Sequence, residues 1–73
     1  MKAETAKAEL KRLTDEAIRG SVSHVEATLE PGEYNIYTEV WAISMRELDK
    51  IRKEASITSI YVDGGRIVLV AKI

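Results

Sequence analysis

The chain has 73 residues and a formal net charge of −1, from 11 Lys and Arg against 12 Asp and Glu. This length holds one small domain, spanning residues 1–73, and excludes a multidomain enzyme. The balanced charge gives no strong electrostatic reason to bind nucleic acid or an anionic membrane. Because the chain has no Cys, disulfides and thiolate metal sites are excluded as well.

An apolar content of 45% is typical of a folded domain rather than a disordered one. The longest apolar stretch, residues 67–71, is far shorter than the ~20 residues that a membrane-spanning helix needs. The first residues, Met1-Lys2-Ala3-Glu4, lack the apolar segment of a secretory signal. We therefore expect a cytoplasmic protein that makes no membrane contact.

Residues 3–19 are predicted to form a helix that ends at Gly20, a residue suited to the left-handed conformation. Polar and charged side chains fill most of the segment, as on a solvated face. Apolar side chains recur at three- and four-residue steps and so share the other face. They are Ala3, Ala6, Leu10, Leu13, Ala17 and Ile18.

A two-residue rhythm then predicts strands over residues 21–30 and 33–43. Pro31 and Gly32 between them form a turn signal, because Pro presets the first corner and Gly accepts a positive φ at the second. If these two residues make up the whole loop, the register of the hairpin follows. The facing pairs are then Ala27 with Ile36, Val25 with Thr38, and His24 with Glu39.

A second helix of roughly three turns is predicted to begin after Ser44. Ser44 can cap the helix, and Glu47 can reach back to the Ser44 amide, which makes a capping box. One apolar face follows, made of Met45, Leu48, Ile51 and Ala55.

The strand rhythm returns from Ile57 and, after Asp63-Gly64-Gly65, over residues 66–73. The Asp-Gly-Gly sequence is a strong hairpin signal, with Asp63-Gly64 or Gly64-Gly65 as the two loop residues. Either choice places Ile60 and Val62 on the same face as Ile67 and Leu69.

The predicted order is therefore α-β-β-α-β-β, and the fold class is α+β. We expect a two-layer α/β sandwich in which both helices cover one face of a four-stranded antiparallel sheet. The strands over residues 33–43 and 66–73 would lie in the centre, with the other two at the edges. Such a sheet corresponds to a circularly permuted ferredoxin-like arrangement.

Alternation assigns each side chain to the covered or to the open side of this sheet. The covered side is expected to hold Val25, Ala27, Leu29, Ile36, Val40, Ile60, Val62, Ile67 and Leu69, packed on Leu10, Leu13, Met45, Leu48 and Ile51. The open side would hold seven apolar or aromatic side chains, a candidate interface. They are Val22, Tyr37, Trp41, Ile57, Tyr61, Val68 and Val70.

The residues give little support for catalysis. His24 is the single histidine, and a cross-strand pair with Glu39 is more simply a polar surface contact than a general base. No nucleophile stands beside it, and scattered carboxylates lack the spacing of a metal site. We expect a protein that is not an enzyme and that uses no metal or cofactor.

The leading hypothesis is a protein-interaction module that forms a homodimer through the open side of the sheet, with Trp41 and Tyr37 as anchors. In one alternative, Tyr37, Trp41 and Tyr61 stack the bases of a single-stranded nucleic acid. In another, the same surface docks on a different protein, as a small inhibitor or adaptor does. The sequence leaves the three open.

Overall fold

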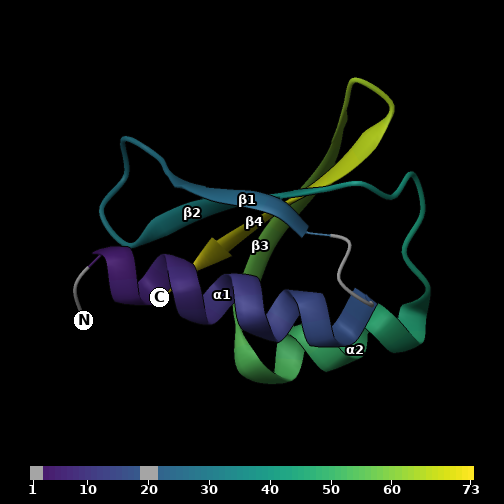
Figure 1. Cartoon of the computed structure of the whole chain (residues 1–73), viewed down its shortest axis with the longest axis horizontal. Coiled ribbons are helices and arrows are strands. Elements are labelled where there is room, and N and C mark those ends of the chain that lie inside the picture. The colour runs from purple at the N-terminus through teal and green to yellow at the C-terminus, as the bar shows by residue number, and fades with distance from the viewer. Residues whose placement is uncertain (1–2, 19–21) are drawn as a thin grey trace.

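The computed structural model describes residues 3–18 and 22–73 and confirms the α+β class and the α-β-β-α-β-β order (Figure 1). The four strands form one antiparallel sheet in the order β1-β2-β4-β3, so that β2 and β4 are central, as predicted. The likeness to a permuted ferredoxin-like arrangement stays a prediction. The elements are α1 (Ala3–Ile18), β1 (Val22–Ala27), β2 (Glu33–Thr38), α2 (Met45–Glu54), β3 (Ser56–Asp63) and β4 (Arg66–Lys72).

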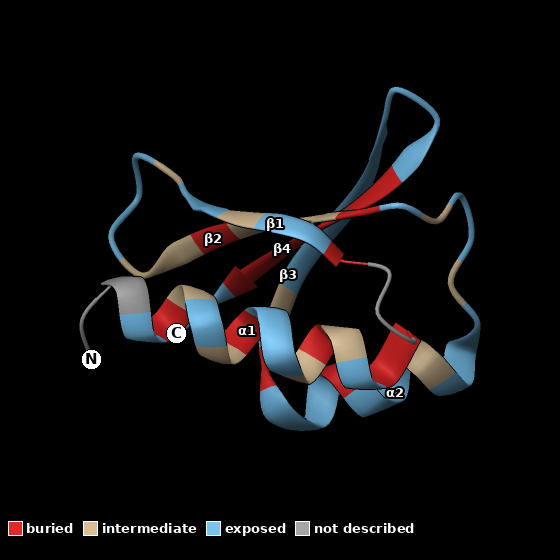
Figure 2. Ribbon diagram, viewed as in Figure 1, coloured by how far each residue is buried: buried red, intermediate tan, exposed pale blue. Residues whose placement is uncertain are grey.

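Both helices lie on one side of the sheet, and the core fills the space between the two layers (Figures 1 and 2). The central strands contribute every second side chain, because alternate residues of a strand point to the same face. The buried apolar cluster consists of Ala6, Leu10, Ala17, Ile18, Val22, Tyr34, Ile36, Ile51, Ala55, Ile67, Leu69 and Ala71.

Helix α1 buries most of the predicted stripe and is joined to β1 by a side chain, but the prediction that Leu13 packs in the core is wrong, because Leu13 is only partly buried and lies outside the buried cluster. Ala6, Leu10 and Ala17 are buried, and the Asp15 carboxylate accepts a hydrogen bond from the Val22 amide at 2.9 Å. This bond fixes the start of the edge strand against the helix. The predicted helix end at Gly20 lies outside the described residues.

Helix α2 begins with the predicted capping box. The Ser44 hydroxyl accepts from the Glu47 amide at 3.1 Å, and the Glu47 carboxylate accepts from the Ser44 amide at 3.0 Å. Ile51 is 1% exposed, whereas Met45 is 69% exposed. The prediction that Met45 packs in the core is therefore wrong, and this first residue of α2 is exposed to solvent.

The register between β1 and β2 differs by two residues from the prediction. Glu33 N bonds Glu30 O at 3.1 Å around Pro31-Gly32, so the turn itself is where the sequence placed it. This turn lies within a five-residue connection, residues 28–32. Ala27, the last residue of β1, pairs with Tyr34. A turn of type I or II splays the strands of a twisted hairpin, which favours the longer loop.

Two residues that were expected in the core are exposed instead. Leu29 is 105% exposed and Ala27 is exposed as well, although both were expected to face the helices. Leu29 sits in the connection, where no strand alternation directs its side chain. Val25 does pack against the core, since a shift of two residues keeps each side chain on its face.

Strand β2 ends at Thr38 instead of continuing to Ile43. The buried Thr38 hydroxyl donates to Ile67 O at 2.7 Å, and Ile67 N donates to Val40 O at 2.7 Å. The Thr38 hydroxyl thus donates to a β4 carbonyl that would otherwise accept from a backbone N–H of β2. The chain leaves the regular sheet at this point, and residues 39–44 connect it to α2.

Strands β3 and β4 form the predicted hairpin with Gly64 and Gly65 as its loop, at φ 61° and 81°. Positive φ at both loop residues defines a type I′ turn, which glycine adopts without strain. The hairpin extends past the helices (Figure 1). For this reason Ile60 and Val62, on the same face as Ile67 and Leu69 as predicted, remain 41% and 63% exposed rather than buried.

Candidate interaction surface

The side of the sheet away from the helices, here called the uncovered face, carries a row of three rings and one valine across the four strands. His24 lies opposite Tyr37, Tyr37 opposite Val68, and Val68 opposite Tyr61. These four residues, the aromatic row, come from β1, β2, β4 and β3 in spatial order. Cross-strand neighbours of this kind contact one another directly, so the row forms one continuous strip.

Val68, at the centre of the aromatic row, is 1% exposed although neither helix covers this side. A tyrosine flanks it on each neighbouring strand, and a phenol ring is long enough to lean over a valine. The pKa of Tyr61 is raised by the loss of water around its hydroxyl and then by the charge and hydrogen bonding of Tyr37. Tyr37 and Tyr61 lie on either side of Val68 in the ladder, which accounts for the burial of this valine on an otherwise uncovered side.

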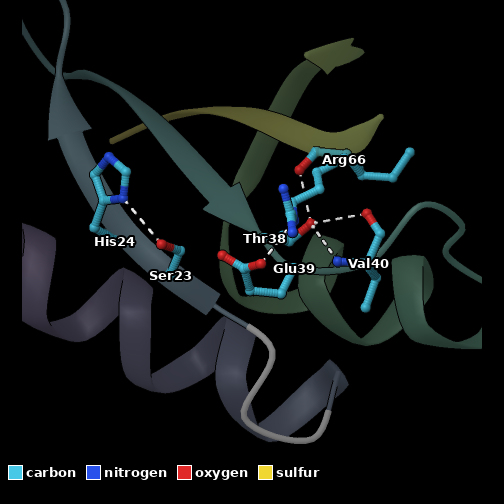
Figure 3. Close-up of polar contacts among 7 residues, drawn as sticks. Ser23, His24, Thr38, Glu39, Val40 and Arg66 are labelled. Carbon is cyan, nitrogen blue, oxygen red and sulfur yellow. Dashed lines mark hydrogen bonds and ion pairs between the residues drawn. The ribbon is translucent and has the colours of Figure 1, made fainter. Parts of the chain in front are cut away.

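His24 ends the aromatic row at the β1 edge. Its ring stacks on Tyr37, with 4.5 Å between the ring centroids and an angle of 10° between the planes. Nε2 lies 3.2 Å from a Glu26 oxygen. Nδ1 lies 3.2 Å from the Ser23 hydroxyl, the contact drawn in Figure 3. The predicted facing of His24 and Glu39 is wrong, since the register shift moves Glu39 past the end of the ladder.

Glu39 instead forms an ion pair with Arg66, with 2.7 Å between the Oε2 and Nε atoms (Figure 3). Arg66 is the first residue of β4 and Glu39 follows the last residue of β2, so the pair closes one end of the uncovered face. A second cross-strand row, mostly polar, lies next to the aromatic row on the same side. It consists of Glu26, Asn35, Val70 and Ser59, with Val70 8% exposed.

Two of the seven predicted interface residues lie in the core instead. Val22 is 7% exposed in the buried cluster, and Ile57 packs against that cluster. The register slips at Ser23 in β1 and at Thr58 in β3, each an extra residue opposite the partner strand. A β-bulge turns the residues before it to the other face of the sheet, which explains both corrections.

Trp41 is 84% exposed, so the helices do not cover it. It lies in the connection between β2 and α2, beyond Thr38, and so is not part of the sheet. The structure therefore brings together four of the predicted residues on the uncovered face and leaves Trp41 apart from them. The four are Tyr37, Tyr61, Val68 and Val70.

Sequence reasoning placed His24 on this side but missed its stacking on Tyr37. The signal was present in the alternation of residues 22–27, but the partner of His24 depends on the loop length, which the Pro-Gly turn alone did not reveal. The exposure of β3 along nearly its whole length was missed as well. It follows from the hairpin reaching past the helices, a tertiary feature.

Within residues 3–18 and 22–73, no three His, Asp or Glu side chains are grouped to hold a metal ion. Neither helix of the described chain combines the length and apolar character needed to span a membrane. Comparison of the chain with protein-family models, with curated proteins and with solved structures finds no match.

Proposed function

We propose that this domain is a non-enzymatic protein-interaction module that binds a second copy of itself through the uncovered face. The observation that carries the proposal is the aromatic row on a side of the sheet that neither helix packs against. Aromatic side chains dominate interface energetics because each buries a large area at a small entropic cost. Covering Tyr37 and Tyr61 is the main gain available to this surface.

The charges on the uncovered face favour a second copy over a strongly charged partner. Glu26 is paired with His24, and Glu39 is paired with Arg66. Glu39 thus brings its own counter-charge, and Glu26 lies beside an imidazole ring, so the aromatic row is not flanked by a strongly charged patch. A two-fold dimer uses the same patch on both chains and needs this self-complementarity.

The nucleic-acid alternative has less support in the geometry. The proposed stacking platform loses Trp41, and Arg66 is already paired with Glu39. A further group of cations, Arg46, Lys50 and Lys53, belongs to α2 in the opposite layer. A single-strand binder needs its cations beside its stacking rings, because backbone charge and bases are recognised together.

The test places a positive charge in the aromatic row. Tyr37→Lys on the central strand β2 is expected to abolish self-association, because a lysine at the centre of an apolar contact loses its hydration. Thr5→Lys, at an exposed position of α1, adds the same charge away from the sheet and is expected to leave the mass in solution unchanged. Asn35→Lys, one row away on the same face, is a second interface variant.

Sedimentation equilibrium measures the mass, and circular dichroism reports whether each variant folds. The proposal is contradicted if folded Tyr37→Lys and Asn35→Lys keep the mass of the parent chain. Titration with a single-stranded oligonucleotide, read by Trp41 fluorescence and repeated at higher salt, tests the alternative. Saturable quenching by a monomeric parent chain would support nucleic-acid binding instead.

A further inference from the structure

Strand β3 is an edge of the sheet and is exposed along almost its whole length (Figure 2). Three consecutive large apolar side chains lie on it, Ile60, Tyr61 and Val62, at 41%, 41% and 63% exposure. An edge strand presents unpaired backbone donors and acceptors to any other strand. Apolar side chains beside such an edge add contact area on both faces of the sheet.

The direction of the backbone groups follows from the contacts of Ile67. Its N–H donates to Val40 O and its C=O accepts from Thr38, each at 2.7 Å, so both groups point toward β2. Val62, opposite Ile67 on β3, therefore forms a non-hydrogen-bonded pair with it. By alternation, the N–H and C=O groups of Val62 and Ile60 point away from β4, to the free edge.

No contact satisfies these outward groups in residues 3–18 and 22–73, where no loop or helix forms a hydrogen bond with the backbone of Ile60 or Val62. The opposite edge of the sheet is protected. There the Val22 amide donates to Asp15, and the strand carries the charged side chain of Glu26. Charge and coverage are the usual means of keeping an edge from pairing.

Strand β3 has neither form of protection. Its sequence from Ser56 to Val62 holds no charged residue and no proline, and Asp63 stands at its end beside the turn. The bulge at Thr58 interrupts the edge only at its beginning. The stretch over residues 59–63 is therefore regular, apolar over its three central residues and free to accept a partner strand.

We propose that residues 59–63 pair antiparallel with residues 59–63 of a second copy, which joins two four-stranded sheets into one of eight strands. The outward groups of Ile60 and Val62 all find partners within residues 59–63 only when Ile60 exchanges hydrogen bonds with Val62 of the other copy, and this sets the register of the proposal. Tyr61 then faces Tyr61 across the two-fold axis. Asp63 faces Ser59, so no like charges are opposed, and this fit of the strand to itself selects a second copy as the occupant.

This contact differs from the one under the proposed function, because it uses the backbone of the β3 edge and leaves Tyr37 on the central strand uncovered, with Tyr61 shared by both. The two contacts respond to different substitutions. Val62→Lys places a charge on the free edge and on the helix side of the sheet, away from the aromatic row. We expect it to halve the mass of the parent assembly, from four chains to two or from two to one.

Ser56→Lys is the matched control, since it adds the same side chain to the same strand outside the paired stretch. Its mass is expected to equal that of the parent chain. Val62 is 63% exposed, so neither substitution disturbs the core, and circular dichroism checks the fold. A folded Val62→Lys with the parent mass would overturn edge pairing, whatever the result for Tyr37→Lys.

An engineered disulfide provides a second measurement, because the chain contains no Cys of its own that could compete. Opposed residues of a non-hydrogen-bonded antiparallel pair lie about 4.5 Å apart at Cα, within the range of a disulfide. Tyr61→Cys is expected to form a covalent dimer under mild oxidation, whereas Ser59→Cys, which faces Asp63, is not. Equal cross-linking of the two variants, or cross-linking of Tyr61→Cys that survives Val62→Lys, would overturn the proposed register.

Discussion

Tyr61 joins the two surfaces described above, because its ring lies on the uncovered face and its backbone on the β3 edge. Its hydroxyl gives a signal that can be followed by titration. Loss of water and the neighbouring Tyr37 both raise its pKa above the ordinary value of 10.0. The raised pKa therefore gives a measure of how strongly Tyr37 acts on Tyr61.

The sign of the effect on stability follows from proton linkage. Below about pH 10 both the folded and the unfolded chain keep the Tyr61 proton, and above it the unfolded chain loses the proton first. The contribution of Tyr61 is therefore fully present below that pH and is lost as pH rises through the raised pKa. We expect Tyr61→Phe to lose less stability than the parent chain between about pH 9 and about pH 11.

Urea unfolding at the two pH values measures this difference, and tyrosinate absorbance follows the ionisation itself. Tyr37→Phe serves as the control, since it keeps Tyr61 and removes the neighbouring hydroxyl. In Tyr37→Phe, the pKa of Tyr61 should move toward the ordinary value of 10.0. An equal loss of stability in the parent chain and in Tyr61→Phe would argue against a meeting of the two phenols.

Two buried threonines are expected to respond oppositely to the same change. The Thr38 hydroxyl donates to Ile67 O at 2.7 Å, whereas the Thr14 hydroxyl, 0% exposed, has no hydrogen-bond partner in the described residues. Thr38→Val leaves a buried carbonyl without its donor and should lower the free energy of unfolding by about 1–2 kcal/mol. Thr14→Val removes an unsatisfied group and should raise it by up to about 1 kcal/mol.

Urea denaturation of the two variants provides the comparison, and each is the other's control for the loss of a hydroxyl. If both substitutions shift the free energy of unfolding in the same direction, hydrogen bonding at these positions does not decide the outcome. Thr38 also ends β2, so its loss should allow the strand to fray toward the β2–α2 connection.

At the scale of elements, the β1–β2 connection requires a glycine for two reasons. Gly32 has φ 78°, and a Cβ there would lie 2.8 Å from Ile73 O, whose residue also donates its amide to Gly32 O. Gly64 has φ 61° but open space around it. Both Gly→Ala variants carry the cost of a positive φ, and only Gly32→Ala carries the steric one.

We therefore expect Gly32→Ala to lower the free energy of unfolding by more than about 1 kcal/mol, and by more than Gly64→Ala does. Thermal unfolding of the two variants measures the difference. Equal losses would mean that the C-terminal residue does not hold the connection in place. Such a result would remove the link between the first hairpin and the end of β4.

The elements themselves were largely predictable because their signals are local. Ser44 and Glu47 announce the start of α2 through their own side chains, and Gly64-Gly65 sets the second hairpin through its own φ angles. The bulges at Ser23 and Thr58 have no such signal. They arise where a strand must fit both its neighbour and the helix layer, a tertiary condition.

The same distinction between local signals and tertiary conditions applies to the candidate surface. Tyr37, Tyr61, Val68 and Val70 follow from alternation within regular stretches, so the sequence places them correctly. Val22 and Ile57 lie before a bulge and turn into the core. Trp41 leaves the sheet because a buried threonine hydroxyl replaces a ladder partner, a substitution that strand propensity does not reveal.

At the scale of the whole molecule, two helices cover one side of a four-stranded sheet and stop short of the β3–β4 hairpin. A chain of this size buries a limited share of its surface, which leaves a small margin of stability. The aromatic row and the β3 edge are where further burial is available. Self-association adds that burial without any change in the fold.

The most direct test of this account is the mass of the unmodified chain in solution across a range of concentrations, by sedimentation equilibrium. The account predicts a mass of two chains or more, each of 8.2 kDa, that falls toward one chain on dilution. A single chain of 8.2 kDa at the highest concentration that stays in solution would contradict it.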